Sequence, residues 1–462
     1  MLFNSYSFML LFLPAVYVLW WALAAHMRLR LSMMVGASYL FYGWSRWEFT
    51  LLLAASTIVD YAVGARMGRE EVPWKRRALL GVSLAANLGM LGYFKYCGFF
   101  AESMNSALQF LRTGAAVHVP DIILPVGISF YTFQTLSYSI DLYRRQIAPA
   151  RSLLHFATYV SLFPQLIAGP IVRYCDLEDQ INALPRRVEW PQCCRGIWLL
   201  TIGMSQKLLI ADPIAGGVNA FLQEPGSMHA AAAWYALLGY SLQLYFDFAG
   251  YSNMARGLGE LLGFSFPENF DSPYRAVSIQ DFWRRWHITL STFLRDYLYI
   301  PLGGSRRGVG RTMFNAVLVM LLGGLWHGAG WTFVLWGLYH GLLLAGYAAY
   351  RGQNRITLAR PIAVGVTFLA VMLGWLLFRA TDMSMAGQWF AALFDFSGSG
   401  SVSPSLKQWS FVAAALAICW FAPSAEKMPK PSGAVAAIGL ACVMTFCILR
   451  FDADSPFLYF QF

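Results

Sequence analysis

Long apolar runs separated by short basic clusters extend along most of this chain. The first run, residues 6–25, is long enough for a membrane-spanning helix, which needs about 20 apolar residues. Arg28 and Arg30 follow it directly, and basic residues mark the cytoplasmic side of a membrane. Residues 1–11 contain no Lys or Arg, so the basic start of a signal peptide is missing. The pattern therefore predicts a retained first helix whose N-terminus lies outside the cytoplasm.

The later apolar runs continue this topology. Further spans are predicted at 31–47, 48–65, 78–100, 121–143, 152–172, 194–216, 230–252, 312–350, 361–379, 408–422 and 433–450. The basic clusters at 66–77 and 144–151 then fall on the cytoplasmic side, and the weakly charged stretch 102–120 falls outside. Proline and glycine residues interrupt the run at 152–172, which predicts a re-entrant segment that is buried in protein or lines a cavity.

The composition excludes a soluble protein. Hydrophobic residues make up 58% of the 462 residues and charged residues only 13%, whereas soluble domains carry about 25% charged residues. We expect an all-α, polytopic integral membrane protein with about 11 membrane-spanning helices plus re-entrant and interfacial helices. No linker divides the chain, so residues 1–462 are expected to form a single membrane domain. The net charge of +10 is explained by cytoplasmic loops, not by a nucleic-acid partner. The seven cysteines include no C-x-x-C pair and are expected to be reduced.

The segment 266–311 combines many arginines with many aromatic residues. Ser278 is placed to cap a helix running to about Tyr297, with Asp281 near its positive end. Phe282, Trp286, Leu290 and Phe293 would share one face of that amphipathic helix, with Trp283, His287 and Leu294 on its flank.

Two interpretations of this helix stay open. In the first, its arginines touch lipid phosphates at the cytoplasmic interface. In the second, Arg284 and Arg285, together with Trp283 and Trp286, receive an anionic acyl carrier such as the phosphates of coenzyme A. His287 is either a proton-transfer group or a core histidine with a satisfied hydrogen bond.

Residues 312–350 contain no charged side chain, yet basic residues lie on both sides, including Arg311, Arg351 and Arg355. One straight helix of that length would run about 58 Å, close to two crossings of the bilayer. Both ends are expected in the cytoplasm, so the segment should fold back at the glycines that follow His327. Close helix packing is expected at Gly323 and Gly324.

This hairpin places His327 deep in the membrane. Burying an ionisable side chain at that depth costs free energy, so we take His327 as a candidate functional residue. Histidine can take and return a proton near neutral pH. The structural alternative is an imidazole hydrogen-bonded between helices. Trp326 flanks it, whereas His340 does not share its helix face and is expected to be structural.

Asp247 is a weaker candidate, because it is a carboxylate inside an apolar run with Tyr251 nearby. It is expected to pair with an arginine or to hold a histidine. Asp60 and Asp141 end apolar runs and are expected to be structural. The histidines form no H-E-x-x-H motif or i,i+4 pair, so no metal site is expected. No nucleophile elbow or phosphate-binding loop is present.

Several stretches together resemble the bacterial membrane-bound O-acyltransferases of the alginate O-acetyltransferase type. They are 125–144 (PVGISFYTFQTLSYSIDLYR), 163–174 (FPQLIAGPIVRY), 245–253 (YFDFAGYSN), 266–269 (FPEN), 282–304 (FWRRWHITLSTFLRDYLYIPLGG) and 325–341 (LWHGAGWTFVLWGLYHG). The opening MLFNSYSF and the closing PFLYFQF are also similar to that subgroup. One departure is Asn253, where the family often has Asp after the GYS triplet.

The resemblance implies a ring of helices around a central tunnel. It also implies transfer of an acyl group from a cytoplasmic thioester to a hydroxyl presented outside. His327 occupies the family's active-site histidine position, and His287 occupies its second position, which is histidine or asparagine.

The primary hypothesis is therefore an inner-membrane O-acetyltransferase that modifies a secreted, alginate-like polysaccharide. It would use acetyl-CoA as a substrate without a tightly bound cofactor, and periplasmic acetyltransferase-like partners would complete the transfer. His327 and His287 would be catalytic, with Asp247, Tyr251 and Trp326 in support. The alternatives are an acyltransferase acting on peptidoglycan, cellulose or teichoic acid, and a proton-coupled transporter with His327 in its relay.

Overall fold

The computed structural model describes residues 1–351, 358–397, 403–429, 433–451 and 457–458. These residues form helices joined by turns and loops, with no β-strand among them. Contacts divide the chain into two compact units, and each unit is built from several stretches that are separated in the sequence. The first unit contains residues 1–200, 254–267 and 451–453, and the second contains residues 201–253, 268–450 and 454–462. The histidines of interest, His287 and His327, both belong to the second unit.

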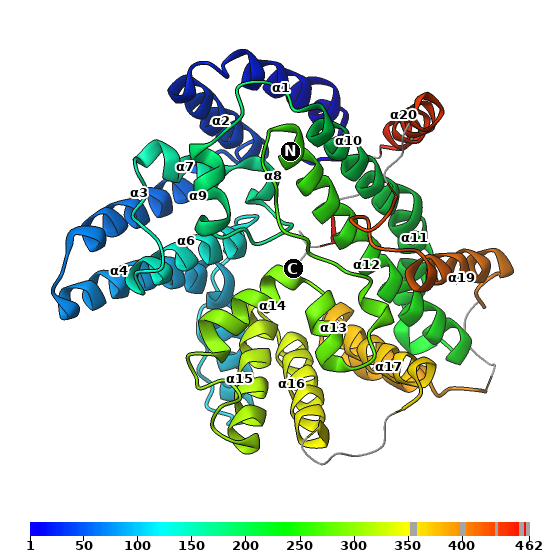
Figure 1. Cartoon of the computed structure of the whole chain (residues 1–462). Helices are drawn as coiled ribbons and strands as arrows, with labels where there is room; N and C mark the ends of the chain where they lie inside the picture. Colours follow the sequence, from blue (N-terminus) through cyan, green and yellow to red (C-terminus); the bar gives the residue numbers. More distant parts are fainter. Residues whose placement is uncertain (352–357, 398–402, 430–432, 452–456, 459–462) are drawn as a thin grey trace. The chain divides into compact units, whose positions relative to one another are not determined.

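The first unit begins with a π-helical segment and continues with apolar α-helices (Figure 1). Its elements are η1 (Ser7–Phe12), α1 (Leu13–Ala22), α2 (Met27–Tyr42), α3 (Glu48–Arg69), α4 (Pro73–Leu91), η2 (Gly92–Tyr96), α5 (Cys97–Phe110), α6 (Ile128–Tyr143), α7 (Leu153–Ser161), α8 (Phe163–Leu166), α9 (Tyr174–Asn182) and most of α10 (Trp190–Ser205). The run at 152–172 is broken between α7 and α8, and the chain from 167 to 173 is not helical, as its prolines and glycines predict.

The second unit carries the longer charge-free helices. Its elements are η3 (Gln206–Ala211), α11 (Asp212–Leu222), η4 (Pro225–Ser227), most of α12 (Ala230–Leu261), η5 (Pro273–Arg275), α13 (Ile279–Arg285), α14 (Ile288–Leu294), η6 (Arg295–Tyr299), α15 (Val309–His327), α16 (Trp331–Arg351), α17 (Arg360–Arg379), α18 (Met383–Ala392), α19 (Leu406–Phe421) and α20 (Ala434–Leu449).

Six helical stretches of the described residues are long and apolar enough to cross a membrane. They are Glu48–Arg69, Pro73–Phe110, Trp190–Leu222, Val309–His327, Trp331–Arg351 and Arg360–Arg379. Three shorter apolar helices, Ser7–Ala22, Leu406–Phe421 and Ala434–Leu449, accompany them. The chain is therefore a multi-pass membrane protein, while the predicted number of about 11 spans stays a prediction. The helical stretch from Pro73 extends to Phe110, so the first part of the weakly charged stretch 102–120 is helical, and its place outside the cytoplasm stays a prediction.

The charge-free segment folds back where the sequence predicts. Helix α15 ends at His327 and α16 begins at Trp331, with the glycine-rich turn between them, and the two helices lie side by side (Figure 1). A Cβ atom on Gly324 would collide with the carbonyl oxygen of Phe333, and one on Gly337 would collide with that of Met320. Only glycine at these two positions allows the backbones to approach so closely. Arg355 lies outside the described residues, as does most of the closing PFLYFQF stretch.

The expected amphipathic helix from Ser278 to about Tyr297 is wrong as a single element. Ser278 does cap α13, because its hydroxyl accepts the N–H of Asp281 at 3.1 Å. The helix stops at Arg285, and α14 starts only at Ile288. The aromatic face of the segment is buried in the second unit and is not laid on an interface.

Asp60 in the first unit lies in a fully satisfied polar cluster. Its carboxylate accepts hydrogen bonds from the Ser83 hydroxyl at 2.5 Å and from the Asn87 amide at 2.8 Å. Ser83 also contacts the Ser139 hydroxyl at 2.8 Å, which links α3, α4 and α6. This arrangement agrees with the structural role expected of Asp60, because buried polar side chains stabilise helix packing when all of them find partners.

Candidate functional site

His327 is the last residue of α15 and is only 6% exposed. Aromatic rings surround its imidazole: the ring centroids of Trp326, Trp336 and Phe378 lie 5.0, 5.1 and 5.2 Å from that of His327. These rings come from α15, α16 and α17, so the hairpin turn and the neighbouring helix together build the pocket wall. Trp326 therefore packs against the imidazole of His327, and its supporting role in catalysis stays a prediction.

His287 lies next to His327, with 6.4 Å between the ring centroids. It stands at the break between α13 and α14 and has a left-handed backbone conformation with φ of +43°. Such a conformation is uncommon for a residue other than glycine, and strained residues of this kind gather at functional sites. The break brings into one site two histidines that are far apart in the sequence.

Asn269 explains both the break and the orientation of His287. The backbone oxygen of Asn269 accepts the N–H of Ile288 at 3.0 Å, and its side-chain oxygen accepts the N–H of Thr289 at 3.3 Å. These bonds satisfy the first donors of α14, which no residue of that helix can do. The same side-chain oxygen lies 3.1 Å from Nδ1 of His287. Because this oxygen is an acceptor, Nδ1 donates, and Nε2 is the nitrogen without a proton in the neutral ring.

The stability of the fold should depend on pH through His287. Its complete burial lowers the pKa of His287 to about 3, against about 6.5 in an unfolded chain. The unfolded chain therefore binds more protons between these values, and folding stability falls as the pH drops below about 6.5. We expect the thermal midpoint in detergent to decrease from pH 7 to pH 5, and His287→Asn to make that decrease smaller. Equal pH slopes for the two proteins would contradict a buried neutral imidazole.

The four predicted donor-binding residues occupy different environments. Arg284 is exposed at the end of α13. Arg285 is already engaged, because its guanidinium lies 2.9 Å from the carboxylate of Asp281 and 3.8 Å from that of Asp271. Trp283 and Trp286 are buried, with 9% and 3% of their surfaces exposed. The structure therefore brings Arg284 to a surface where a ligand can reach it. The two tryptophans pack among other aromatic rings, with centroid distances of 5.8 Å from Trp283 to Trp336 and 4.8 Å from Trp286 to Trp375.

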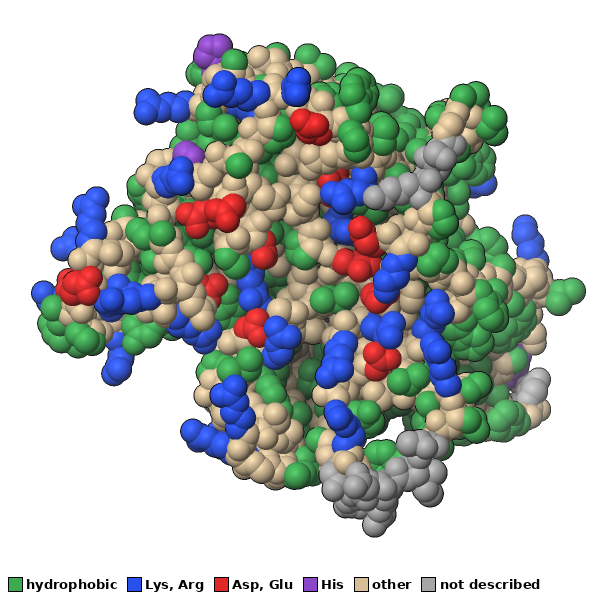
Figure 2. All heavy atoms as spheres, viewed as in Figure 1, with side chains coloured by type: hydrophobic (Ala, Val, Ile, Leu, Met, Phe, Trp, Pro, Cys, Tyr) green, Lys and Arg blue, Asp and Glu red, His purple; other side chains and the backbone are tan. Residues whose placement is uncertain are grey.

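Basic side chains gather on one face of the second unit. Figure 2 shows Lys and Arg side chains over the region of α13 to α17, with a smaller number of acidic side chains between them. On α16, Arg351 donates to the side-chain oxygen of Gln280 at 3.0 Å, so the C-terminal end of α16 lies beside the start of α13. The basic ends of the hairpin and the arginines of α13 therefore share one side of this unit.

Asp247 has a different partner from the one expected. Its carboxylate forms a buried ion pair with Lys207 at 2.7 Å, and not with an arginine or a histidine. Lys207 also contacts Asp212 at 2.8 Å. The other oxygen of Asp247 accepts the backbone N–H of Leu458 at 3.0 Å. Asp247 therefore links α12 to Lys207 in η3 and to the backbone of Leu458.

Tyr251 belongs to the same cluster, because its ring packs on that of Phe457 with 4.6 Å between centroids. The same Phe457 ring also contacts Lys207, whose ammonium nitrogen lies 4.8 Å from the ring centroid. Asp247 and Tyr251 thus hold Leu458 and Phe457 against α12.

Sequence reasoning missed Lys207 and Asn269. Lys207 is a charged residue inside the predicted span 194–216, which is itself a signal of a buried partner, and Asp247 is the matching charge in a second apolar run. Asn269 gave no separate signal, because asparagine in a loop is ordinary. Its contact with His287 depends on the fold.

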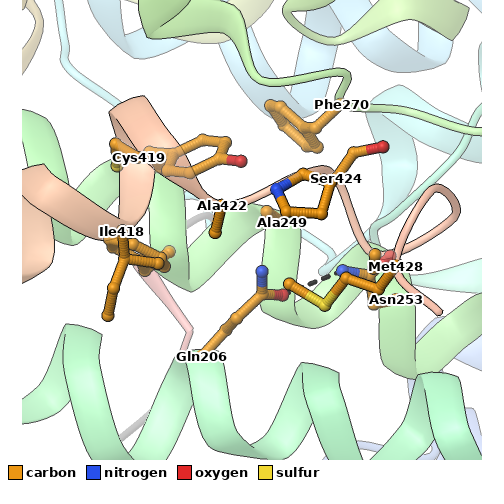
Figure 3. Close-up of a pocket in the computed structure, with 13 residues that line it drawn as sticks. Gln206, Ala249, Asn253, Phe270, Ile418, Cys419, Ala422, Ser424 and Met428 are labelled. Atoms are coloured by element: carbon orange, nitrogen blue, oxygen red, sulfur yellow. Dashed lines mark hydrogen bonds between the residues drawn. The ribbon is translucent and has the colours of Figure 1, made fainter. Parts of the chain in front are cut away.

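The second unit contains a small cavity between side chains of η3, α12 and α19 and the loops that follow α12 and α19 (Figure 3). Its volume of about 30 Å³ is enough for one or two water molecules and too small for an acyl donor. Asn253 lines it and donates to the side-chain oxygen of Gln206 at 2.8 Å. Phe270 also lines it and contacts Phe248, whose ring meets that of His287 at 4.8 Å. The residue that departs from the family pattern therefore makes a neutral amide pair.

His340 and the cysteines are further side chains of types that bind metal ions. His340 is fully buried, and its ring centroid lies 4.9 Å from that of Trp336. In the described part of the chain, no group of three or more His, Cys, Asp or Glu residues could hold a metal ion. All seven cysteines are free.

Comparison with known proteins gives one matching family. Residues 146–378, which include both histidines, match the membrane-bound O-acyltransferase family (MBOAT). A probable alginate O-acetylase of Pseudomonas putida is 40% identical, with 100% of both chains covered. One of Azotobacter vinelandii is 44% identical over 86% of this chain and 78% of the relative. A peptidoglycan O-acetyltransferase of Helicobacter pylori is 37% identical over 84% of this chain and 78% of the relative.

Proposed function

Because the chain belongs to the membrane-bound O-acyltransferase family and is an O-acyltransferase, we propose that it acetylates a secreted, alginate-like polysaccharide. The donor is a cytoplasmic thioester, acetyl-CoA in the simplest case. The enzyme lies in the bacterial inner membrane with its N-terminus on the periplasmic side. The observation that carries the proposal is the pair of buried histidines with ring centroids 6.4 Å apart inside a wall of aromatic rings.

The proposed chemistry needs one base. His327 takes the proton of an acceptor hydroxyl, and the hydroxyl oxygen attacks the thioester carbonyl carbon. The C–S bond then breaks, the new C–O ester bond remains, and the thiolate leaves with the proton that His327 returns. The aromatic wall excludes water from the thioester, which would otherwise be hydrolysed. His287, oriented by Asn269, is proposed to position the thioester with its Nε2 side.

Arg284 is proposed to hold the anionic part of the donor at the basic face. Guanidinium groups bind phosphates through paired hydrogen bonds, and Arg284 is exposed while Arg285 is held by Asp281. We expect the double variant Arg284→Ala, Arg285→Ala to raise the KM for acetyl-CoA about tenfold. This is the change expected when one charge-assisted contact to the donor is lost. Arg450→Ala, which removes a cation at the end of α20, is the control. Unchanged donor affinity in the double variant would remove this site.

The acceptor hydroxyl belongs either to the polysaccharide or to a periplasmic acetyltransferase-like partner that passes the acetyl group on. Relatives named for alginate and for peptidoglycan support a carbohydrate as the final acceptor. The identity to the two alginate relatives, 40% and 44%, is higher than the 37% identity to the peptidoglycan relative, which favours alginate-like polymers over peptidoglycan.

The test is a reconstitution experiment. Purified protein in sealed vesicles receives radiolabelled acetyl-CoA on one side and acceptor on the other, and the label on the acceptor is measured. Transfer that requires the donor on the basic face and the acceptor on the opposite side is the expected result. Movement of a solute without consumption of thioester would instead favour a transporter. Transfer to peptidoglycan fragments but not to uronate chains would change the proposed acceptor.

A further inference from the structure

We propose that an open polar groove in the second unit binds a carboxylate-bearing saccharide, the acceptor in the proposed reaction. The inference rests on the proposed function and adds a binding site for its acceptor. The groove has a volume of about 520 Å³, within the range of about 300–1,000 Å³ that is usual for ligand sites. The polar side chains that line it include Asn219, Gln223, Arg379, Thr381, Asp382 and Gln388.

Arg379 supplies the positive charge of the groove. Its guanidinium donates to the side-chain oxygen of Asn219 at 3.1 Å and lies 5.9 Å from the ring centroid of Tyr240. These two contacts hold the group in place. No carboxylate of the described residues lies within ion-pair distance of it. A half-exposed, oriented and unpaired guanidinium is suited to bind a carboxylate through two parallel hydrogen bonds.

Asp382 does not neutralise Arg379. One of its carboxylate oxygens accepts the N–H of Met385 at 2.9 Å, and the other accepts the Thr381 hydroxyl at 3.0 Å. The Met385 bond is the main reason why the pKa of Asp382 lies below its usual range. Asp382 thus caps α18 and keeps its charge, and it can also accept sugar hydroxyls. The side-chain amides of Gln223 and Gln388 each offer both a donor and an acceptor.

This combination of groups favours a polyhydroxylated acid. Neutral amides and hydroxyls match sugar hydroxyls, and a single guanidinium matches one carboxylate per binding site. A protein-docking surface would present a large aromatic anchor in an apolar pocket, and the groove lining contains no Trp, Tyr or Phe. We therefore take a chain of uronic acid units as the ligand.

The groove lies close to the candidate active site and away from the basic face. Arg379 directly follows Phe378, whose ring contacts that of His327 at 5.2 Å. Arg360 and Arg379 stand at opposite ends of α17, so the groove and the basic start of this helix lie on opposite sides of the proposed membrane. A saccharide in the groove would reach the histidine from the side opposite to the donor.

The experiment measures binding of a hexauronate oligosaccharide to the full chain in nanodiscs of zwitterionic lipid. We expect Arg379→Gln to weaken binding at least tenfold and Arg379→Lys to weaken it less, because lysine keeps the charge without the paired donors. Lys407→Gln is the matched control, because Lys407 is an exposed cation near the groove but not in its lining. The neighbouring Gln408 lies close to Gly217, two residues before Asn219 of the groove. Lys407→Gln should bind like the wild type, and a neutral hexasaccharide should bind at least tenfold more weakly than the hexauronate.

Three results would overturn the proposal. Equal affinity of the wild type and Arg379→Gln would remove the groove as the site. Loss of hexauronate binding when anionic lipid is added to the nanodiscs would identify a lipid headgroup as the natural ligand. Binding of a purified periplasmic protein that requires Arg379, without saccharide binding, would identify a protein partner. Lys407→Gln should transfer acetyl groups to the acceptor at the wild-type rate, and failure of the wild type to transfer any acetyl group from acetyl-CoA would count against the proposed function instead.

Discussion

His327→Ala is expected to lower the rate of acyl transfer by at least about 100-fold, because positioned general bases contribute about 10²–10⁴-fold to enzymatic rates. The side chain is 6% exposed and is enclosed by three aromatic rings, so no solvent group can replace it as the base. The measurement is the initial rate of label transfer from acetyl-CoA in reconstituted vesicles. Binding of acetyl-CoA should change little, since Arg284 lies at a different place.

A stability measurement separates catalysis from folding at this position. His327→Gln keeps a polar side chain of similar length, and it should unfold at nearly the wild-type temperature while staying inactive. His155→Ala is the matched control, because His155 in α7 belongs to the first unit, where its Nδ1 contacts the Ser152 hydroxyl at 2.8 Å. Normal transfer by His327→Ala would show that the catalytic assignment is wrong. Failure of both His327 variants to fold would make the imidazole structural.

Lys207→Met should destabilise the protein by about 3–5 kcal/mol, the usual cost of leaving one charge of a buried pair without its partner. Lys207 and Asp247 have side chains that are 3% and 2% exposed, so water cannot replace the missing ammonium. The measurement is the free energy of unfolding in mixed detergent, or the shift of the thermal midpoint where unfolding is irreversible. Activity should fall only in proportion to the folded fraction.

Two further variants test this interpretation. Lys207→Met with Asp247→Leu should lose less stability than the sum of the two single changes, because the double variant leaves no fully buried charge unpaired, only the partly exposed carboxylate of Asp212. Arg145→Ala breaks the exposed pair with Glu71, whose side chains are 62% and 80% exposed, and should cost only about 0–1 kcal/mol. A loss of similar size in Lys207→Met and Arg145→Ala would argue against a dry ion pair.

The sequence predicts best those features that follow from chain chemistry alone. The absence of charge from 312 to 350 and the glycines after His327 predict the hairpin, and the structure has it with the turn at these residues. The Ser278 cap and the interrupted run at 152–172 are likewise found. Each depends on a rule about local backbone or about desolvation of charge, so no tertiary contact is needed to predict it.

Features that depend on distant residues were not predicted. The periodicity of 278–297 favours one helix, but Asn269 satisfies the first donors of α14 and allows the chain to break at His287. The pattern of residues 278–297 does not predict this break, because Asn269 lies outside that segment. The partner of Asp247 was open for the same reason, since Lys207 is 40 residues away along the chain. The donor-binding role of Arg284 and the catalytic roles of both histidines stay predictions.

The hydrogen bond from Leu458 to Asp247 has a consequence for biosynthesis. The two residues are 211 positions apart, and a ribosome that adds about 5–20 residues per second needs roughly 10–40 s to make the intervening chain. During this interval, α12 is already synthesised, but one carboxylate oxygen of Asp247 lacks its hydrogen-bond donor. A nascent chain that stalls late in translation would thus expose an incomplete polar cluster, which membrane quality-control proteases could use to recognise it.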